Sequence, residues 1–129
     1  MKDNDQESIV WLTQIPHRVE RDSTGNYARD KDGKTRIVPS VDIKPLAEHG
    51  RVEIMMPPMT SFFATGDLIV SLRSKLRDYN YDRGDCVCCL GDPAIIAVTG
   101  SVLSEITRTY TLLIWDRLIK RYVKIKIAL

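Results

Sequence analysis

The pattern of apolar and polar positions predicts a strand, a helix and a second strand in direct succession between residues 85 and 116. Residues 85–90 are a short, largely apolar run, which is typical of a strand buried on both faces. Asp92 then suits a helix N-cap and Pro93 the first helical position. Residues 110–116 predict the second strand. In such a βαβ unit the strands are parallel and the helix is the crossover.

The segments on either side of this unit extend the sheet. Residues 51–56 favour a strand and are followed by two prolines, so they predict a first core strand. A helix is predicted from Thr65 or Asp67 to Leu76, because its apolar residues recur at helical spacing. Residues 122–128 predict a last strand, in which branched apolar residues alternate with lysines. The expected fold is α/β, with a small, mostly parallel βαβαββ sheet and an antiparallel C-terminal edge hairpin.

The first third of the chain is expected to lie outside this core as an N-terminal β-ribbon, over residues 8–44. Its first apolar segment favours a strand, but Pro16 confines that segment to a sheet edge or splits it. Asp32-Gly33 suits a tight turn that pairs residues 27–29 with residues 36–38. No internal repeat is apparent along the chain.

Length and composition are those of one globular domain. The chain has 129 residues, of which 43% are hydrophobic and 28% charged, so it is long enough to bury a core. We expect a mobile tail over residues 1–7 and a single α/β domain over residues 8–129, with its βαβαββ core in residues 45–129. The net charge of +2 excludes a strongly basic nucleic-acid-binding protein and a strongly acidic DNA mimic, but it is compatible with a local charged patch.

Two features of the sequence predict a cytoplasmic protein with no membrane partner. No apolar run approaches the roughly 20 residues that span a bilayer. The polar start, MKDNDQES, lacks the basic and apolar regions of a signal peptide. In addition, Cys86, Cys88 and Cys89 form an odd, clustered set with no partners elsewhere, which indicates a reducing compartment.

The residues offer no assembled catalytic or cofactor chemistry. The only histidines, His17 and His49, lie in the N-terminal third, and no nucleophile and base are paired by spacing. The three clustered cysteines lack the spacing of a metal site and are interpreted as core residues, so we expect neither metal nor cofactor. Asp92, in the turn before a helix, is a candidate ligand site for phosphate or metal. A helix cap is the favoured interpretation, because a carboxylate repels phosphate.

Two surfaces are candidates for binding. The first is an adaptable apolar loop that favours contact with a protein, although it equally suits a lid over the core. Its residues are Met55, Met56, Met59, Phe62 and Phe63. The second is a basic C-terminal hairpin that would contact nucleic acid phosphates, with Tyr122 or Trp115 available to stack on a base. Its residues are Arg117, Lys120, Arg121, Tyr122, Lys124 and Lys126. Tyr122, Lys124 and Lys126 are expected on the outward face of the last strand, where lysines also protect a sheet edge.

Three motifs within residues 36–128 are informative together: Pro57-Pro58, Leu90-Gly91-Asp92-Pro93, and Leu113-Ile114-Trp115-Asp116-Arg117 followed by Arg121-Tyr122. In these motifs the segment resembles a set of short phage and mobile-element proteins of no known activity. This resemblance implies a phage or mobile-element origin and assigns no functional residue. We expect a non-enzymatic accessory protein that binds a host or viral protein in the host cytoplasm. The alternatives are a nucleic-acid-binding protein and a small nucleotide- or phosphate-handling enzyme, with its site between residues 57–61 and 91–93.

Overall fold

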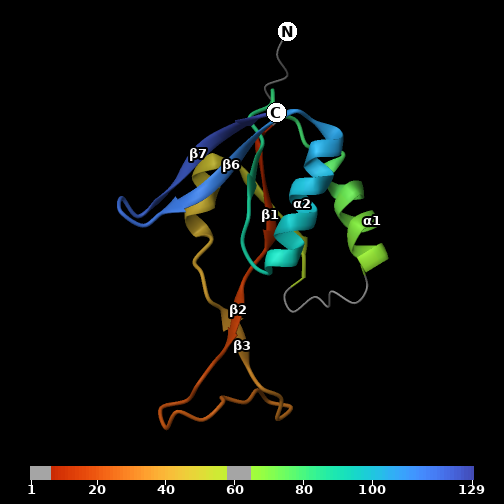
Figure 1. Ribbon diagram of the computed structural model, residues 1–129. Coiled ribbons are helices and arrows are strands. Elements are labelled where there is room, and N and C mark those ends of the chain that lie inside the picture. Colours follow the sequence, from red (N-terminus) through yellow and green to blue (C-terminus); the bar gives the residue numbers. More distant parts are fainter. Residues whose placement is uncertain (1–6, 58–64) are drawn as a thin grey trace.

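A computed structural model describes residues 7–57 and 65–129 (Figure 1). Its main feature is a five-stranded sheet in the order β4-β1-β5-β6-β7. The first four of these strands are parallel, and β7 is antiparallel to β6. The α/β fold, the mostly parallel sheet and the antiparallel C-terminal hairpin are thereby confirmed. The strands are β1 (Ile9–Gln14), β4 (Arg51–Met56), β5 (Cys86–Cys88), β6 (Thr109–Asp116) and β7 (Arg121–Ala128).

Two helices cover one face of the sheet and a short 3-10 helix covers the other (Figure 1). The two helices, α1 (Thr65–Leu76) and α2 (Pro93–Ile106), lie side by side and contribute Leu72 and Ile95 to their side of the core. On the opposite face, the 3-10 helix η1 (Lys44–His49) inserts Leu46 into a second apolar cluster. The sheet is therefore buried on both faces, as expected of parallel strands.

The N-terminal strand corrects one sequence-based prediction. Residues 9–14 were assigned to the ribbon, but β1 lies in the sheet between β4 and β5, and all six of its residues are buried. Ile9 and Trp11 face the helices, whereas Val10 and Leu12 face η1. A strand that is apolar on both faces is stable only inside a sheet, so the parallel strands number four rather than three. The strand ends just before Pro16, which splits the segment.

The ribbon begins after this proline and extends away from the sheet (Figure 1). It contains β2 (His17–Val19) and β3 (Ile37–Pro39), which pair with each other in a separate antiparallel sheet. The predicted pairing of residues 27–29 with 36–38 does not form as a ladder, and one backbone hydrogen bond, from Arg36 N to Ala28 O, joins the two segments. Instead, Arg21 bridges to Tyr27 and Arg29 bridges to Thr35, so two further small turns close between the strands.

These two turns are copies of one motif, which corrects the prediction that the chain has no internal repeat. Arg-Asp-x-x-Gly occurs at residues 21–25 and again at 29–33. In each copy the aspartate Oδ1 accepts two backbone N–H groups, and the arginine guanidinium donates to the glycine carbonyl. Both glycines have positive φ, 86° and 78°, a conformation that favours glycine. The repeat is polar and confined to turns, so it has no hydrophobic periodicity.

The two turns and the β2–β3 pair meet at a closed ring of backbone hydrogen bonds, which we call the three-way junction. Glu20 N donates to Arg36 O (2.9 Å), Arg36 N donates to Ala28 O (2.8 Å), and Ala28 N donates to Glu20 O (2.8 Å). These three residues are spaced eight apart, one repeat unit each. Three arms therefore leave the junction: β2–β3, residues 21–27 and residues 29–35.

Candidate functional site

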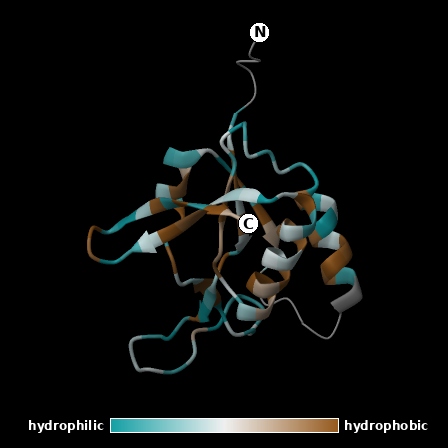
Figure 2. Ribbon diagram, turned by 45° about the horizontal axis from the view of Figure 1, so that its top comes forward, coloured by the Kyte–Doolittle hydropathy of each residue, from teal (hydrophilic) through white to brown (hydrophobic). Residues whose placement is uncertain are grey.

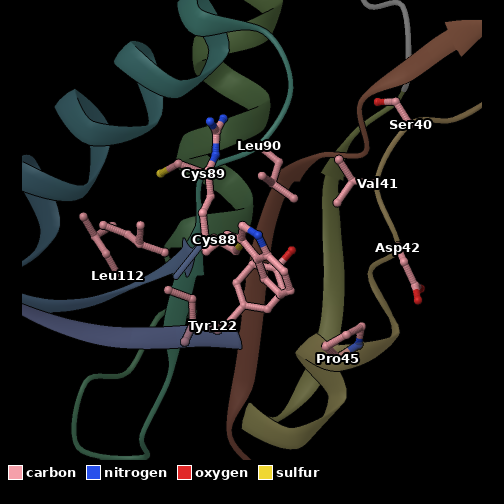
Figure 3. A pocket seen from close by; sticks show the side chains of 13 residues that line it. Ser40, Val41, Asp42, Pro45, Cys88, Cys89, Leu90, Leu112 and Tyr122 are labelled. Carbon is pink, nitrogen blue, oxygen red and sulfur yellow. The ribbon is translucent and has the colours of Figure 1, made fainter. Parts of the chain in front are cut away.

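A cavity of about 840 Å³ opens where β5 ends. It lies between residues 40–45, which lead into η1, and the β6–β7 hairpin; Figure 3 shows Cys88, Leu90 and Tyr122 across it from Asp42 and Pro45. This is the carboxyl end of two parallel strands, where open α/β sheets commonly bind ligands. We call it the hairpin pocket, and its lining residues are Ser40, Val41, Asp42, Pro45, Cys88, Cys89, Leu90, Leu112, Leu113, Ile114, Trp115, Arg117 and Tyr122.

The pocket exists because β5 is much shorter than β6. Pairing between these strands ends at Cys88 and Leu113, so Ile114 and Trp115 pair with β7 on one side and border the cavity on the other. The chain leaves the sheet at Leu90, whose backbone N–H donates to Thr13 Oγ1 at 2.8 Å. It then turns at Gly91, which has a φ of +90°. A side chain at Gly91 would collide with Gln14, because an added Cβ would lie 2.5 Å from Gln14 Oε1.

The floor of the pocket is apolar and one wall is aromatic. Cys88, Leu113 and Tyr122 are buried, whereas Trp115 is 42% exposed. The Trp115 and Tyr122 rings meet edge to face, with centroids 5.0 Å apart. Burial raises the pKa of the Cys88 thiol to about 12 and also raises the pKa of Cys89. Both thiols are therefore protonated at neutral pH and behave as apolar surface rather than as nucleophiles.

Two lining residues carry charge at neutral pH, Arg117 from the hairpin and Asp42 from the segment before η1. The Asp42 carboxylate accepts a hydrogen bond from Lys44 N at 3.0 Å, which holds it at the start of η1. An apolar floor with an exposed tryptophan and separate opposite charges is suited to binding an apolar group with polar flanks.

The structure places all five predicted basic residues on the β6–β7 hairpin and corrects the position of Tyr122. Arg117, Lys120 and Arg121 are exposed at the turn of the β6–β7 hairpin, and Lys124 and Lys126 are exposed along β7. Tyr122 was expected on the outward face but is only 6% exposed, because its ring packs into the cluster on the η1 side of the sheet. Trp115 is the exposed aromatic residue of this hairpin.

The predicted apolar loop is only partly described. Met55 and Met56 are 1% and 7% exposed and belong to the core beneath α1 and α2, so they fit the alternative interpretation in which this segment packs on the core. Met59, Phe62 and Phe63 lie outside the described residues.

Asp92, the candidate ligand-site residue, caps α2. Its carboxylate accepts a hydrogen bond from Ala94 N at 2.9 Å, as the cap prediction requires. Its backbone N–H donates to Gln14 Oε1 at 2.9 Å. The residue does not line the hairpin pocket. Within residues 7–57 and 65–129, no three histidine, cysteine or acidic side chains gather in a way that would hold a metal ion.

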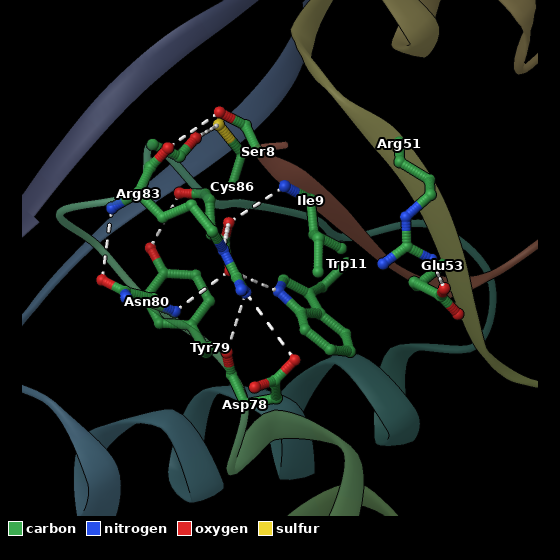
Figure 4. Close-up of polar contacts among 12 residues, drawn as sticks. Ser8, Ile9, Trp11, Arg51, Glu53, Asp78, Tyr79, Asn80, Arg83 and Cys86 are labelled. Carbon is green, nitrogen blue, oxygen red and sulfur yellow. Dashed lines mark hydrogen bonds and ion pairs between the residues drawn. The ribbon is translucent and has the colours of Figure 1, made fainter. Parts of the chain in front are cut away.

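Asp85 is a second candidate, because its carboxylate is buried and its pKa is perturbed. Figure 4 shows Trp11, Asn80 and Arg83 converging on one place, and there the carboxylate accepts Ile9 N, Trp11 Nε1, Asn80 N and two guanidinium N–H groups of Arg83. Burial raises the pKa of Asp85, but these hydrogen bonds outweigh burial and the pKa is lowered overall. Both carboxylate oxygens are thus occupied, so the group joins β1 to the start of β5.

Comparison with known proteins gives one family. A model of phage Pam3 gp32-like proteins matches residues 26–129. The chain belongs to this family. Its phage origin, implied by the sequence resemblance, is thereby confirmed. Neither the curated proteins nor the solved structures contain a match. Among the described residues, no helix is long and apolar enough to cross a membrane.

The family match covers every residue that lines the hairpin pocket, but sequence reasoning did not find the pocket. It depends on the difference in length between β5 and β6 and on the path of residues 40–45. The only sequence signal was Trp115, a large aromatic residue next to the charged turn that ends a strand.

Proposed function

We propose that this phage protein is a non-enzymatic accessory protein that binds a partner protein through the hairpin pocket and the adjoining β6–β7 hairpin. The observation that carries the proposal is the apolar pocket with Trp115 on its wall. Binding hot spots in protein interfaces are typically aromatic residues beside well-packed apolar pockets, and Arg117 adds another residue type that is common there.

The tip of the hairpin supports a protein partner. Leu118 is 94% exposed and Ile119 is 54% exposed, and Figure 2 shows this turn as a hydrophobic end that extends from the molecule. Covering exposed aliphatic residues with a protein surface is favourable, by about 25 cal/mol per Å² of apolar area buried. Phosphate groups offer no such burial. We place this binding in the host cytoplasm, since the three cysteines are free thiols.

The test uses a pair of variants of matched exposure. Partners captured from phage-infected host cells are purified, and their affinity for the protein is measured by calorimetry. Trp115→Ala should weaken binding at least tenfold. Ile54→Ala should leave it unchanged, because Ile54 is 44% exposed on β4, at the opposite edge of the sheet. Equal effects of the two substitutions would refute a binding surface at the pocket.

A second candidate function is nucleic-acid binding by the basic hairpin, favoured by the five exposed basic residues of residues 117–126. Phosphate contacts release counterions, so affinity should fall with salt at a log–log slope of about −0.7 to −0.9 per contact. A mobility shift that is lost in the Lys124→Glu/Lys126→Glu double variant but retained in Leu118→Ser would favour this function over the first.

A further inference from the structure

We infer that the hairpin pocket binds an extended acidic segment of the partner, which adds as a strand to the open edge of β6 in line with β5; this inference rests on the proposed function. Three observations carry it: the open edge itself, the apolar floor beneath it, and the distribution of charge around it.

The open edge comes first. β6 pairs with β7 along all eight of its residues, from Thr109 with Ala128 to Asp116 with Arg121. Its pairing with β5 ends at Leu113. The backbone from Ile114 onward therefore faces the cavity on the side where β5 would have continued. Unpaired strand edges present alternating N–H and C=O groups, which an added peptide strand satisfies with main-chain hydrogen bonds.

The floor determines what the added strand would carry. Successive side chains of a strand point to opposite faces, so every second residue of the guest would face the same wall of the pocket. Leu113 and Tyr122 are buried there, and Trp115 stands beside them with 42% of its surface exposed. An apolar residue at alternate positions of the guest would cover the tryptophan and bury its own side chain.

Charge selects acidic residues for the remaining positions. Residues 117–129 contain five basic residues and no acidic residue, whereas the rest of the chain is net acidic. Arg117 lines the pocket, and Arg121, which pairs with Asp116, lies on the face of the sheet opposite Leu113, toward which these remaining positions would point. Complementary charge of this kind gives specificity and speeds association. A nucleic acid would also be attracted, but its backbone carries no N–H donors to pair with the β6 carbonyls as an added peptide strand would.

The experiment uses synthetic peptides as the probe. A fluorescein-labelled decapeptide of alternating glutamate and valine is titrated with the full-length protein at low salt, and fluorescence anisotropy reports binding. A matched peptide with the same side chains but with three alternate backbone nitrogens methylated should bind at least tenfold more weakly. A lysine–valine peptide should also bind at least tenfold more weakly. In a ¹H–¹⁵N spectrum the Trp115 indole signal should shift, while that of Trp11, which is hydrogen-bonded to Asp85, stays in place.

The outcomes separate this inference from the proposed function. Equal binding of the methylated peptide would overturn strand addition, and tighter binding of an oligothymidylate that shifts the Trp115 signal would overturn the choice of an acidic peptide. Absence of binding by the glutamate–valine peptide would overturn the inference as well. If the captured partner still required Trp115 in any of these cases, the proposed function would stand without it. If that partner were indifferent to Trp115→Ala, both would fail.

Discussion

The side chain of Asp85 connects parts of the chain that are far apart in sequence. Its carboxylate binds backbone and indole N–H groups of β1 and the guanidinium of Arg83, and its carbonyl accepts the Tyr79 hydroxyl. The Tyr79 oxygen in turn accepts Thr111 N from β6 at 3.0 Å. Burial raises the pKa of Tyr79 to about 12, so the phenol remains protonated and can donate. A single residue thus links the amino ends of three strands: it precedes β5, its carboxylate binds β1, and its backbone carbonyl reaches β6 through Tyr79.

This geometry predicts how stability depends on pH. Because the folded pKa of Asp85 is lowered from its ordinary value of 3.8, the carboxylate stabilises the fold above about pH 4, and this contribution is lost as the pH falls through the folded pKa. Asp85→Asn should reduce the free energy of unfolding at pH 7 by about 3 kcal/mol, because it leaves the Arg83 charge without its buried partner. It should also flatten the acid limb of the stability curve. Urea denaturation between pH 2 and pH 7 measures both effects.

The control for this prediction is Asp82→Asn, which removes an exposed carboxylate from the same loop. It should change the free energy of unfolding by less than about 0.5 kcal/mol. An acid limb of the same steepness in Asp85→Asn and in the unmodified protein would contradict the assignment.

At the scale of elements, the passage from β5 to α2 depends on one glycine. Gly91→Ala should destabilise the protein by about 2 kcal/mol or more, because a φ of +90° disfavours any Cβ and the Gln14 side chain fills the space. Gly100→Ala is the matched control. Gly100 lies inside α2 with nothing within 4 Å of an added Cβ, so alanine there should stabilise by about 0.5–1 kcal/mol. Chemical denaturation measures the free energy of unfolding of both variants, which should fall in Gly91→Ala and rise in Gly100→Ala. Equal changes in the two variants would refute this prediction.

Sequence reasoning found most elements but misplaced β1. The bounds of β4 were predicted to the residue, and α2 begins at Pro93 because of the cap that Asp92 provides. Local sequence patterns are enough to predict where a helix or strand ends if a capping residue, the hydrophobic periodicity or a proline marks that end. The prediction for β1 was wrong because a strand buried on both faces shows no alternation of apolar and polar residues. Without that alternation, the segment could not be distinguished from an edge strand interrupted by Pro16.

The candidate site was less accessible to sequence reasoning than the fold. The basic residues of the hairpin were recognisable, because they are close in sequence and share one element. The pocket depends on where a three-residue strand stops relative to an eight-residue neighbour, and strand ends are set by tertiary contacts such as that of Thr13 with Leu90. The burial of Tyr122 likewise depends on the cluster around Leu46, a residue that is far from Tyr122 in the sequence.

For the whole molecule, the uneven distribution of charge matters more than its total. The net charge of +2 conceals a strongly basic hairpin joined to a net acidic body. Steering by such a patch acts over about a Debye length, which is about 8 Å at physiological salt. The hairpin can therefore attract an acidic partner although the protein as a whole is nearly neutral.

The three-way junction implies that the ribbon changes length in whole octapeptides. If residues 21–28 are excised, Glu20 is joined to Arg29, and the pairs Val19–Ile37 and Arg29–Thr35 fall into one continuous hairpin without a register slip. The free energy of unfolding of the shortened protein, measured by urea titration, should lie within about 1 kcal/mol of that of the parent protein. The excision removes a compact exposed loop and no core contact. Excision of residues 21–27 removes one residue fewer, so it shifts every later residue to the opposite face and should open the ribbon to proteolysis.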